Sequence, residues 1–357
     1  MILKSIELRN YRNFVNEKVS FCNGSNIISG KNAQGKTNLI ESVWLFTAGR
    51  SFRTPNEKEF IRNDCDSAFI KGVFSRNGRD YEAELRFFSN KTKQIYINGI
   101  KVRQNEMLGK FPAVLFFPEQ LSLIKSGPEV RRKFLDMSIS QIKPRYYEVL
   151  AEYNRVLAQK NHLLKNKNSS VLDTLEIWNA RQAKLSSLIS NTRKTYCNKL
   201  TEYASRYLTE ISGKTEKLTV EYTVSGGTNN EYELFELICN SQKAEIDSGF
   251  TQIGAHKDDF DLFINGNSSK RFASQGQQRS IVLCLKLAEA DMIEETHGEY
   301  PLLLFDDVLS ELDEQRKDFI TNRIKDKQVI ITSCDIPDGV GDNVLRIENG
   351  KCISNGV

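Results

Sequence analysis

The sequence predicts an α/β fold, in which a mixed sheet with an antiparallel β patch is joined to a separate lobe of helices. Three observations predict it. A glycine-rich stretch, residues 26–43, runs from a short apolar strand through a loop into an amphipathic helix. Compact apolar segments at residues 302–305 and 329–332 are typical of strands buried in a parallel sheet. The middle of the chain shows the long periodicity of helices instead.

The glycine-rich loop fits the pattern glycine, four residues, then Gly-Lys-Thr, which is typical of phosphate-binding loops. Its residues are Gly30, Lys31, Asn32, Ala33, Gln34, Gly35, Lys36 and Thr37. Glycines let backbone N–H groups turn inward as an anion nest, and the next helix adds partial positive charge at its N-terminus. We expect Lys36 to reach a nucleotide's terminal phosphates and act in catalysis, and Thr37 to offer its hydroxyl to Mg²⁺. The alternative is a glycine-rich surface turn before a core helix.

The composition is that of an ordinary globular protein. With 357 residues, 39% of them hydrophobic, the chain can form two domains or one large split domain. No apolar run approaches the roughly 18 residues of a membrane span, and the N-terminus alternates like a strand, unlike a signal peptide. We therefore expect a soluble cytoplasmic protein with no membrane partner. The seven cysteines form no Cys-x-x-Cys pair, so neither a zinc site nor a disulfide framework is indicated.

Turn signals and periodicity divide the chain further. Short alternating runs between residues 68 and 102 are broken at Asn77-Gly78 and Asn98-Gly99, pairs that favour type I′ turns and predict the antiparallel patch. Helical periodicity follows Pro128. We expect an α/β head formed by residues 1–120 and 216–357, interrupted by a helical lobe of residues 121–215.

The helical segment is also the basic part of the chain. The formal net charge of +4 is small for this length, but between Glu129 and Lys199 the bases clearly outnumber the acids. A basic face of this kind can contact nucleic-acid phosphates, and we expect the lobe to face DNA. The alternative is an ordinary solvated helical face.

A second motif, "PLLLFDDVLSELD" at residues 301–313, is an apolar strand that ends in two aspartates. A nucleotide-binding sheet places its magnesium carboxylate at such a strand end. We expect Asp306 to serve Mg²⁺ and Asp307 to orient or deprotonate the attacking water. The alternative is that both carboxylates cap a turn after a core strand.

A third motif, "RFASQGQQRS" at residues 271–280, places Ser274 at a helix N-cap and Gly276 where bulk would block close approach. A helix start with exposed N–H groups is a second anion site. One nucleotide needs one phosphate cradle, so two cradles suggest that each serves a different nucleotide, shared across a dimer. The alternative is a plain capped helix.

The three motifs, in this order, resemble those of the ABC-type ATPases, with the SMC-like subgroup the most similar. Other strings resemble the bacterial RecF family of recombination mediators within that subgroup. They are "LRNYRNF" at residues 8–14, "GRSFRT" at 49–54, "FFPEQLSLIKSGPEVRRKFLD" at 116–136 and "GAHKDDFDLFING" at 254–266. The similarity extends over nearly the whole length.

The resemblance implies an ABC-type P-loop ATPase head that binds ATP with Mg²⁺. It implies an ATP-dependent homodimer in which Ser274, Gly276 and Gln277 of one copy bind the other copy's nucleotide. Residues 310–313 would cross the dimer, and Gln120 would take the catalytic place of the glutamine loop. The resemblance also implies slow ATP hydrolysis, binding to double-stranded DNA and gapped DNA, and cooperation with RecR and RecO in loading RecA during repair and replication restart.

Several positions depart from the broader ABC pattern. Asp307 stands where transporter ATPases usually carry glutamate, and "ITSCD" at residues 331–335 has no switch histidine. Gln275 replaces the first signature glycine, and Ala255 replaces a proline of the RecF-like string. A shorter carboxylate and a missing imidazole both predict weak hydrolysis. Two other classes remain as alternatives, the motor subunit of a membrane transporter and the head of a long coiled-coil protein.

Two further features have open roles. The string "HKDD", which begins at His256, invites a metal or catalytic reading, but a hydrogen-bonded turn is the commoner explanation. Arg12, Arg50 and Arg53 can either reach phosphates or solvate strand ends.

Overall fold

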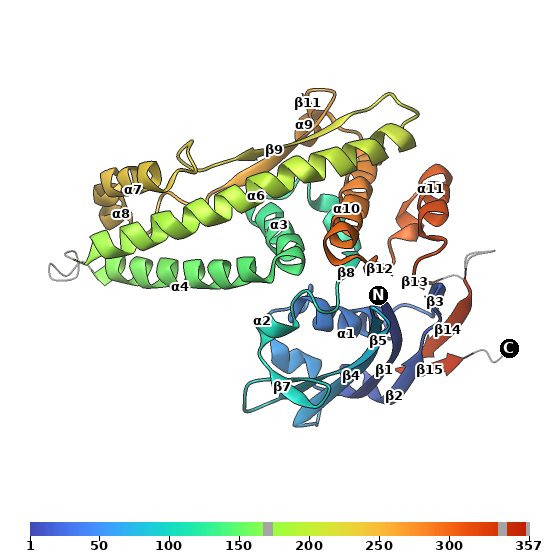
Figure 1. Cartoon of the computed structure of the whole chain (residues 1–357). Coiled ribbons are helices and arrows are strands. Elements are labelled where there is room, and N and C mark those ends of the chain that lie inside the picture. The colour runs from blue at the N-terminus through green and yellow to red at the C-terminus, as the bar shows by residue number, and fades with distance from the viewer. Residues whose placement is uncertain (167–173, 335–340, 355–357) are drawn as a thin grey trace. The chain divides into compact units, whose positions relative to one another are not determined.

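The computed structural model describes residues 1–166, 174–334 and 341–354 (Figure 1). It divides into two compact units, of which the first joins Met1–Leu121 to Lys286–Val357 and the second is Ser122–Leu285. The chain therefore leaves the first unit and returns to it late, inside helix α10 (Gln275–His297).

The second unit is larger than the expected helical lobe of residues 121–215. The segment 216–285, which we assigned to the head, clusters with the helices. Packing explains the difference, because strand β9 (Leu218–Thr223) contacts helix α6 (Leu175–Ile211) and pairs with β10 (Asp259–Ile264). The alternation of a short strand shows one buried face but does not identify the sheet to which it belongs.

A six-stranded sheet carries the glycine-rich loop in the first unit. Its strand order is β15-β14-β3-β13-β12-β8, in which five strands run parallel and β15 is antiparallel at the edge. The bounds are β3 Ser25–Ser29, β8 Ala113–Phe116, β12 Leu302–Asp306, β13 Val329–Ser333, β14 Asn343–Glu348 and β15 Lys351–Ser354. Strand β12 is buried along its whole length, and its Phe305 ring stacks on Phe116 with centroids 4.2 Å apart. The late apolar segments thus form the predicted parallel strands.

The expected antiparallel patch is a second six-stranded sheet of the first unit. Its order is β2-β1-β4-β5-β6-β7, and every neighbouring pair is antiparallel. The bounds are β1 Ile2–Tyr11, β2 Phe14–Ser20, β4 Ser67–Arg76, β5 Arg79–Phe88, β6 Gln94–Ile97 and β7 Ile100–Val102. Both predicted hairpin turns have left-handed backbones, with φ of 50° at Asn77 and 49° at Asn98. Type I′ turns require this conformation.

Helix α1 (Lys36–Ala48) contacts strands of both sheets of the first unit. Trp44 and Phe46 are fully buried, and the Phe46 ring lies 5.3 Å from Phe74 and 6.4 Å from Phe111 between centroids. The predicted amphipathic helix is therefore covered on most sides. The smaller helices of this unit are η1 Glu57–Phe60, α2 Gln104–Met107, η2 Pro118–Ser122, η3 Leu309–Glu311 and α11 Glu314–Ile324.

The second unit combines long helices with a small sheet, β11-β10-β9 (Figure 1). Its other elements are α3 Pro128–Ile142, α4 Pro144–Asn166, α7 Glu231–Asn240, α8 Gln242–Ser248, β11 Asn267–Ser268 and α9 Ser269–Phe272. Helix α6 contacts both α4 and α7. Along the described stretches, no helix has the length and apolar character needed to cross a lipid bilayer.

Candidate nucleotide-binding site

The glycine-rich loop has an unusual backbone. Gly30, Ala33 and Gly35 have positive φ angles of 152°, 63° and 117°. At Gly30 a side chain is impossible without rearrangement, because its Cβ would lie 2.4 Å from the Ile347 carbonyl oxygen. The loop therefore passes closely under β14, and Gly35 starts α1 without a side-chain cap. The first N–H groups of α1 are thus left for an anion.

Lys36 lies at the centre of this loop. Its side chain is 7% exposed, and Nζ donates to the carbonyl oxygens of Gly30 at 2.5 Å and Lys31 at 3.1 Å. Nζ also lies 3.6 Å from the Cys334 Sγ. The ammonium therefore faces the loop with carbonyl dipoles and a thiol around it. A buried cation of this kind is stabilised by a bound anion.

The side chains of Thr37 and Asp306, each expected to serve Mg²⁺, lie in contact. The Asp306 Oδ1 accepts from the Thr37 hydroxyl at 3.0 Å and from the Thr332 hydroxyl at 2.8 Å. Burial raises the pKa of Asp306, the two threonine hydrogen bonds oppose this shift, and the neighbouring charge of Asp307 adds to it. A bound cation would favour the carboxylate form.

The donors at this site fit Mg²⁺ held with a nucleotide. Mg²⁺ prefers oxygen ligands and usually takes one or two from the protein, with substrate phosphates and water supplying the rest. Thr37 and Asp306 supply a hydroxyl and a carboxylate. Within the described residues no group of three or more His, Cys, Asp or Glu side chains could hold a metal. This donor set suits a metal shared with phosphates.

Asp307 has a left-handed backbone with φ of 53°. Its N–H donates to the Thr332 hydroxyl at 2.9 Å, and its carbonyl accepts from Ser310. Thr332 thus links both aspartates, because the same hydroxyl donates to Asp306. No motif of the sequence identifies Thr332, and only its place near the end of an apolar strand could have indicated it.

Gln120 makes its contacts away from this cluster. Its amide, oriented so that both ends are satisfied, donates to the Leu115 carbonyl at 2.9 Å and accepts from the Lys286 Nζ at 3.2 Å. Among the described residues, no hydrogen bond joins Gln120 to Lys36, Thr37 or Asp306. Its catalytic assignment stays a prediction.

Asn13, which lies between strands β1 and β2, forms hydrogen bonds that hold the glycine-rich loop. Its Nδ2 donates to the Gln34 carbonyl at 2.7 Å, and its Oδ1 accepts from Asn38 at 2.8 Å. Arg53 then donates to the Asn38 Oδ1 at 2.7 Å. The "LRNYRNF" and "GRSFRT" strings contain Asn13 and Arg53, but their local patterns do not show that both meet the loop.

Arg12, Arg50 and Arg53, whose roles the sequence left open, have different surroundings in the structure. Arg12 makes two hydrogen bonds of 2.9 Å to the buried carboxylate of Glu41, which also accepts from Tyr11. Arg12 is therefore structural. Arg53 lies near the site, since its charge opposes the raised pKa of Asp306 that burial causes. Arg50 is exposed.

Cys334 belongs to the string "ITSCD", which has no switch histidine. Its Sγ donates to the Asn32 Oδ1 at 2.9 Å, and it lies against Lys36. The site therefore has a thiol in place of an imidazole, in agreement with the departure noted in the sequence.

The third motif forms an exposed helix start in the second unit. Ser274 and Gln277 make a reciprocal pair of caps, in which the Ser274 Oγ accepts from the Gln277 N–H at 3.2 Å and the Gln277 Oε1 accepts from the Ser274 N–H at 2.8 Å. Ser274 and Gln275 are exposed, and Gly276 is half-buried. The Gln277 Nε2 donates to Glu216 at 2.7 Å. Gln277 is therefore bonded within its own unit, so its role in nucleotide binding stays a prediction.

The "HKDD" string is structural. The His256 Nδ1 lies 2.8 Å from the Tyr153 hydroxyl, and burial lowers the pKa of His256 to about 4. Asp258 accepts from Ser190, Tyr222 and Ser225. The commoner explanation, a hydrogen-bonded turn, is correct.

The basic surface of the helices is smaller than the sequence suggested. Arg131, Lys160 and Arg193 are buried and bonded to Asp259, Glu245 and Asp136 respectively. Between Glu129 and Lys199, the described bases that stay exposed are Lys133, Lys143, Arg145, Arg155, Lys165, Arg181, Lys184 and Lys194.

Comparison with known proteins gives one consistent family. Residues 2–338 match the family model described as RecF/RecN/SMC N terminal domain. The chain is 40% identical over 363 residues to the DNA replication and repair protein RecF of Clostridium acetobutylicum, covering 98% of this chain and 99% of that protein. It is 39% identical to the RecF protein of Ruminiclostridium cellulolyticum, covering 93% of this chain and 92% of the relative.

Solved structures give the same result. The recombination mediator protein RecF with ATPrS, described as part of the RecFOR pathway, superposes with a TM-score of 0.94 at 37% identity, covering 99% of this chain and 98% of that one. Its counterpart with ATP has a TM-score of 0.92, also at 37% identity, covering 99% and 97%. An Smc head domain from Pyrococcus furiosus matches at 0.56 with 15% identity over 99% and 96%, which shows a shared fold alone.

Proposed function

Because this chain belongs to the RecF family, we propose that it is an ATP-dependent, DNA-binding recombination mediator with a weak ATPase activity. The observation that carries the proposal is the contact of Thr37 with Asp306 beside the buried ammonium of Lys36. It occurs in a chain about as long as its RecF relatives. The chemistry of the site and the family to which the chain belongs both indicate ATP as the nucleotide.

The residues of the loop divide the work of binding ATP. The N–H groups at the start of α1 surround the β- and γ-phosphates, and Lys36 turns from its carbonyl partners to these charges. Thr37 and Asp306 would hold Mg²⁺, which would neutralise phosphate charge. Asn13 keeps the loop in shape through Gln34.

Asp307 is the proposed base for hydrolysis. Its backbone is fixed by Thr332, and its carboxylate accepts a proton from the water that attacks the γ-phosphorus, so that ADP leaves with its bridging oxygen. Hydrolysis is weak because aspartate has the shorter reach and Cys334 offers no imidazole. This rate suits a regulatory step.

Two ATP molecules join two copies of the chain in our proposal. The exposed helix start at Ser274 meets the nucleotide held by the other copy's loop, with Gly276 allowing close approach. Residues 310–313 cross the dimer. The exposed position of Ser274 supports this step, because a buried helix start could not meet a second molecule.

DNA is bound by the lobe of the second unit. Its exposed bases contact phosphates of duplex DNA near a single-strand gap, so that binding depends on DNA shape and falls as salt rises. RecR and RecO are the proposed partners in loading RecA. Relatives described as part of the RecFOR pathway support this assignment.

Sedimentation with and without ATP and duplex DNA tests the proposal. Wild-type protein is expected to form a dimer with ATP and to bind DNA as that dimer. Lys36→Ala should lose both, and Ser274→Ala should keep ATP binding but lose the dimer. A Lys36→Ala variant with full ATP-dependent DNA binding would contradict the proposal.

The transporter-motor alternative has less support. The relatives described above are replication and repair proteins and an Smc head. Cell fractionation separates the two, since a motor subunit would travel with membranes.

A further inference from the structure

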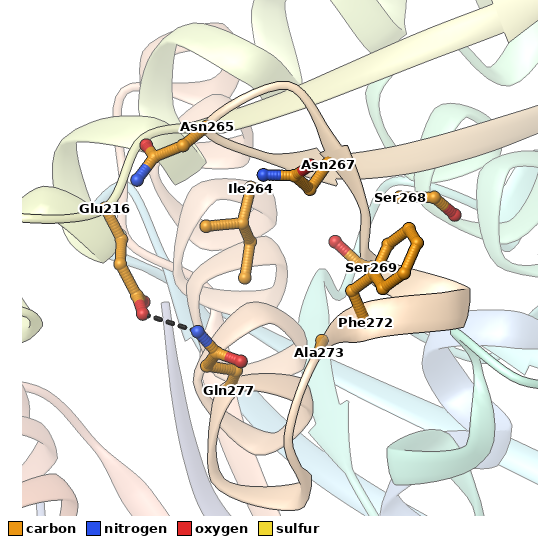
Figure 2. A pocket seen from close by; sticks show the side chains of 9 residues that line it. All are labelled: Glu216, Ile264, Asn265, Asn267, Ser268, Ser269, Phe272, Ala273 and Gln277. Carbon is orange, nitrogen blue, oxygen red and sulfur yellow. Dashed lines mark hydrogen bonds between the residues drawn. The ribbon is translucent and has the colours of Figure 1, made fainter.

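A cavity of about 400 Å³ lies beside the start of α10, within the second unit (Figure 2). Its walls come from the β10–β11 hairpin, α9, the first turn of α10 and Glu216, which precedes β9. Pockets that bind ligands have volumes of about 300–1,000 Å³. None of the roles proposed above uses this cavity.

Three groups define what the cavity can bind. Glu216 is the only charged residue of its lining. The Glu216 Oε1 accepts from Gln277, which leaves Oε2 available. Ser269 is 1% exposed, and its hydroxyl has no hydrogen-bond partner among the described residues. The Phe272 ring is 71% exposed and stands at the same cavity.

This set of groups suits a cation on an apolar stem. A carboxylate binds an ammonium or guanidinium group through charge-assisted hydrogen bonds, and a buried hydroxyl without a partner needs one. An exposed aromatic face also attracts cations. A phosphate group, by contrast, would be repelled by Glu216. Lysine and arginine side chains have the required form, with a charged end on an aliphatic chain.

We infer that the cavity receives the Lys31 side chain of a second copy of this chain. The inference rests on the proposed ATP-joined dimer. Ala273 and Gln277 line the cavity and flank Ser274, so a surface that presents a phosphate to Ser274 also faces this cavity. In the dimer that surface is the other copy's glycine-rich loop.

Lys31 is the cation that this loop can offer. Lys36 is buried and turned to the loop carbonyls. Lys31 is exposed, and in the part of the chain that the structure describes its ammonium makes no hydrogen bond or ion pair. Both charged groups that the contact needs are therefore present, and among the described residues neither has an ion-pair partner.

The contact also strengthens the signature helix start. Glu216 holds the Gln277 amide, and Gln277 in turn accepts from the Ser274 N–H at 2.8 Å. A cation on Oε2 fixes the Glu216 carboxylate in the orientation that keeps both bonds. Glu216 is then a positioning residue that becomes effective only in the dimer.

Zero-length carbodiimide cross-linking of the full chain tests the contact directly. This reagent joins an ammonium and a carboxylate that touch. With ATP, mass spectrometry should find an amide between Lys31 and Glu216 of different copies, and without ATP the amide should be absent. Efficient cross-linking of the ATP dimer at other sites, with this pair missing, would overturn the inference.

Charge reversal gives an independent measurement. Lys31→Glu and Glu216→Lys should each weaken the ATP-dependent dimer about tenfold, as expected for a contact of about 1.4 kcal/mol, and the double variant should recover most of the affinity. Arg50→Glu, which changes another exposed base of the first unit, is the matched control and should leave the dimer Kd within about twofold. Glu216→Gln removes the charge with little change in shape and should give a smaller loss.

The outcomes separate this inference from the proposed function. If wild-type protein forms the ATP dimer but Glu216→Lys and Glu216→Gln do not change its Kd, the cavity contact is wrong and the dimer stands. If the double variant is no better than Lys31→Glu, the pairing is also wrong. If wild-type protein forms no dimer with ATP, the proposed function fails first. Equilibrium binding of ATP to dilute protein should be equal in Glu216→Lys and wild type.

Discussion

The two units treat buried charge in opposite ways. In the first, the Lys36 ammonium is buried among carbonyl oxygens and a thiol. In the second, Arg193 is 2% exposed and bonded through two nitrogens to Asp136, at 2.9 and 3.0 Å. A buried charge is costly unless it is paired. The first arrangement is therefore completed by a ligand, whereas the second is complete within the protein.

The starts of helices α1 and α10 also differ, in whether side chains cap them. Gly35 begins α1 without a side-chain cap, while Ser274 and Gln277 cap α10 reciprocally. A buried charge is thus a binding group where its partner is missing and a structural group where the partner is present, whereas the capped start of α10 is exposed and so stays accessible for the proposed contact with a second copy. This difference can be measured by changing one member of each set.

The largest effect is expected for Asp136→Ala. It leaves the Arg193 guanidinium buried without its carboxylate, and breaking such a pair costs about 3–5 kcal/mol. Urea unfolding measures this loss. Asp80→Ala is the matched control, because the Asp80 pair with Lys4 is exposed and its removal should hardly change stability. Equal losses in the two variants would remove burial as the cause.

Lys36→Met should have the opposite outcome to Asp136→Ala, because it should weaken ATP binding without lowering the stability of the nucleotide-free protein. Losing the ammonium that meets the phosphates should weaken ATP binding by about 2–5 kcal/mol, or roughly 30-fold or more. Stability without nucleotide should stay the same or rise, because a buried charge without a counter-charge is removed. Calorimetric titration with ATP and urea unfolding give the two numbers. A stability loss like that of Asp136→Ala would show that Lys36 is structural.

His256 makes the completed interior of the second unit sensitive to acid. Burial lowers its pKa from 6.5 to about 4, so between these values the unfolded chain binds a proton that the folded chain does not. Stability is therefore full above pH 6.5 and is lost as pH falls toward 4, by roughly 1–3 kcal/mol. Unfolding of wild type and His256→Gln across this range measures the difference. If the unfolding free energy of wild type depends on pH with the same slope as that of His256→Gln, the prediction is wrong.

The smallest effect is expected for Ser274→Ala. Loss of an N-cap costs about 1 kcal/mol of stability, and Ser274→Asp, which keeps an acceptor, should lose little. ATP binding by a single copy should not change in either variant. Thermal unfolding measures the stability that the cap contributes. If either variant changes the ATP affinity of a single copy, Ser274 contacts the nucleotide of its own copy and the proposed assignment is wrong.

The sequence predicted the local parts of the site well. The glycine-rich loop with Lys36 and Thr37, and the strand that ends in Asp306, each follow from a pattern of a few neighbouring residues. The contact between Thr37 and Asp306 joins motifs 269 residues apart and was not itself predicted. Thr332 could not be found in this way, because it meets Asp306 only through the parallel register of β12 and β13. The domain limit at residue 216 failed for a related reason, since the neighbours of β9 lie far along the chain.

The sequence also did not show which of the basic side chains are buried. From the sequence, Arg131 and Arg193 were counted with the basic surface of the helices. Their acidic partners come from other elements of the fold. Only the packing of those elements distinguishes such bases from the exposed ones.

The strand order of the loop-bearing sheet also has a consequence during synthesis. Both neighbours of β3, the strands β13 and β14, come from the segment that begins at Val329. Contacts this distant in sequence form late, and the intervening unit can fold first as the ribosome delivers it. A nascent chain thus carries its glycine-rich loop without a sheet to hold it, and it acquires a nucleotide cradle only after the residues beyond Val329 have emerged.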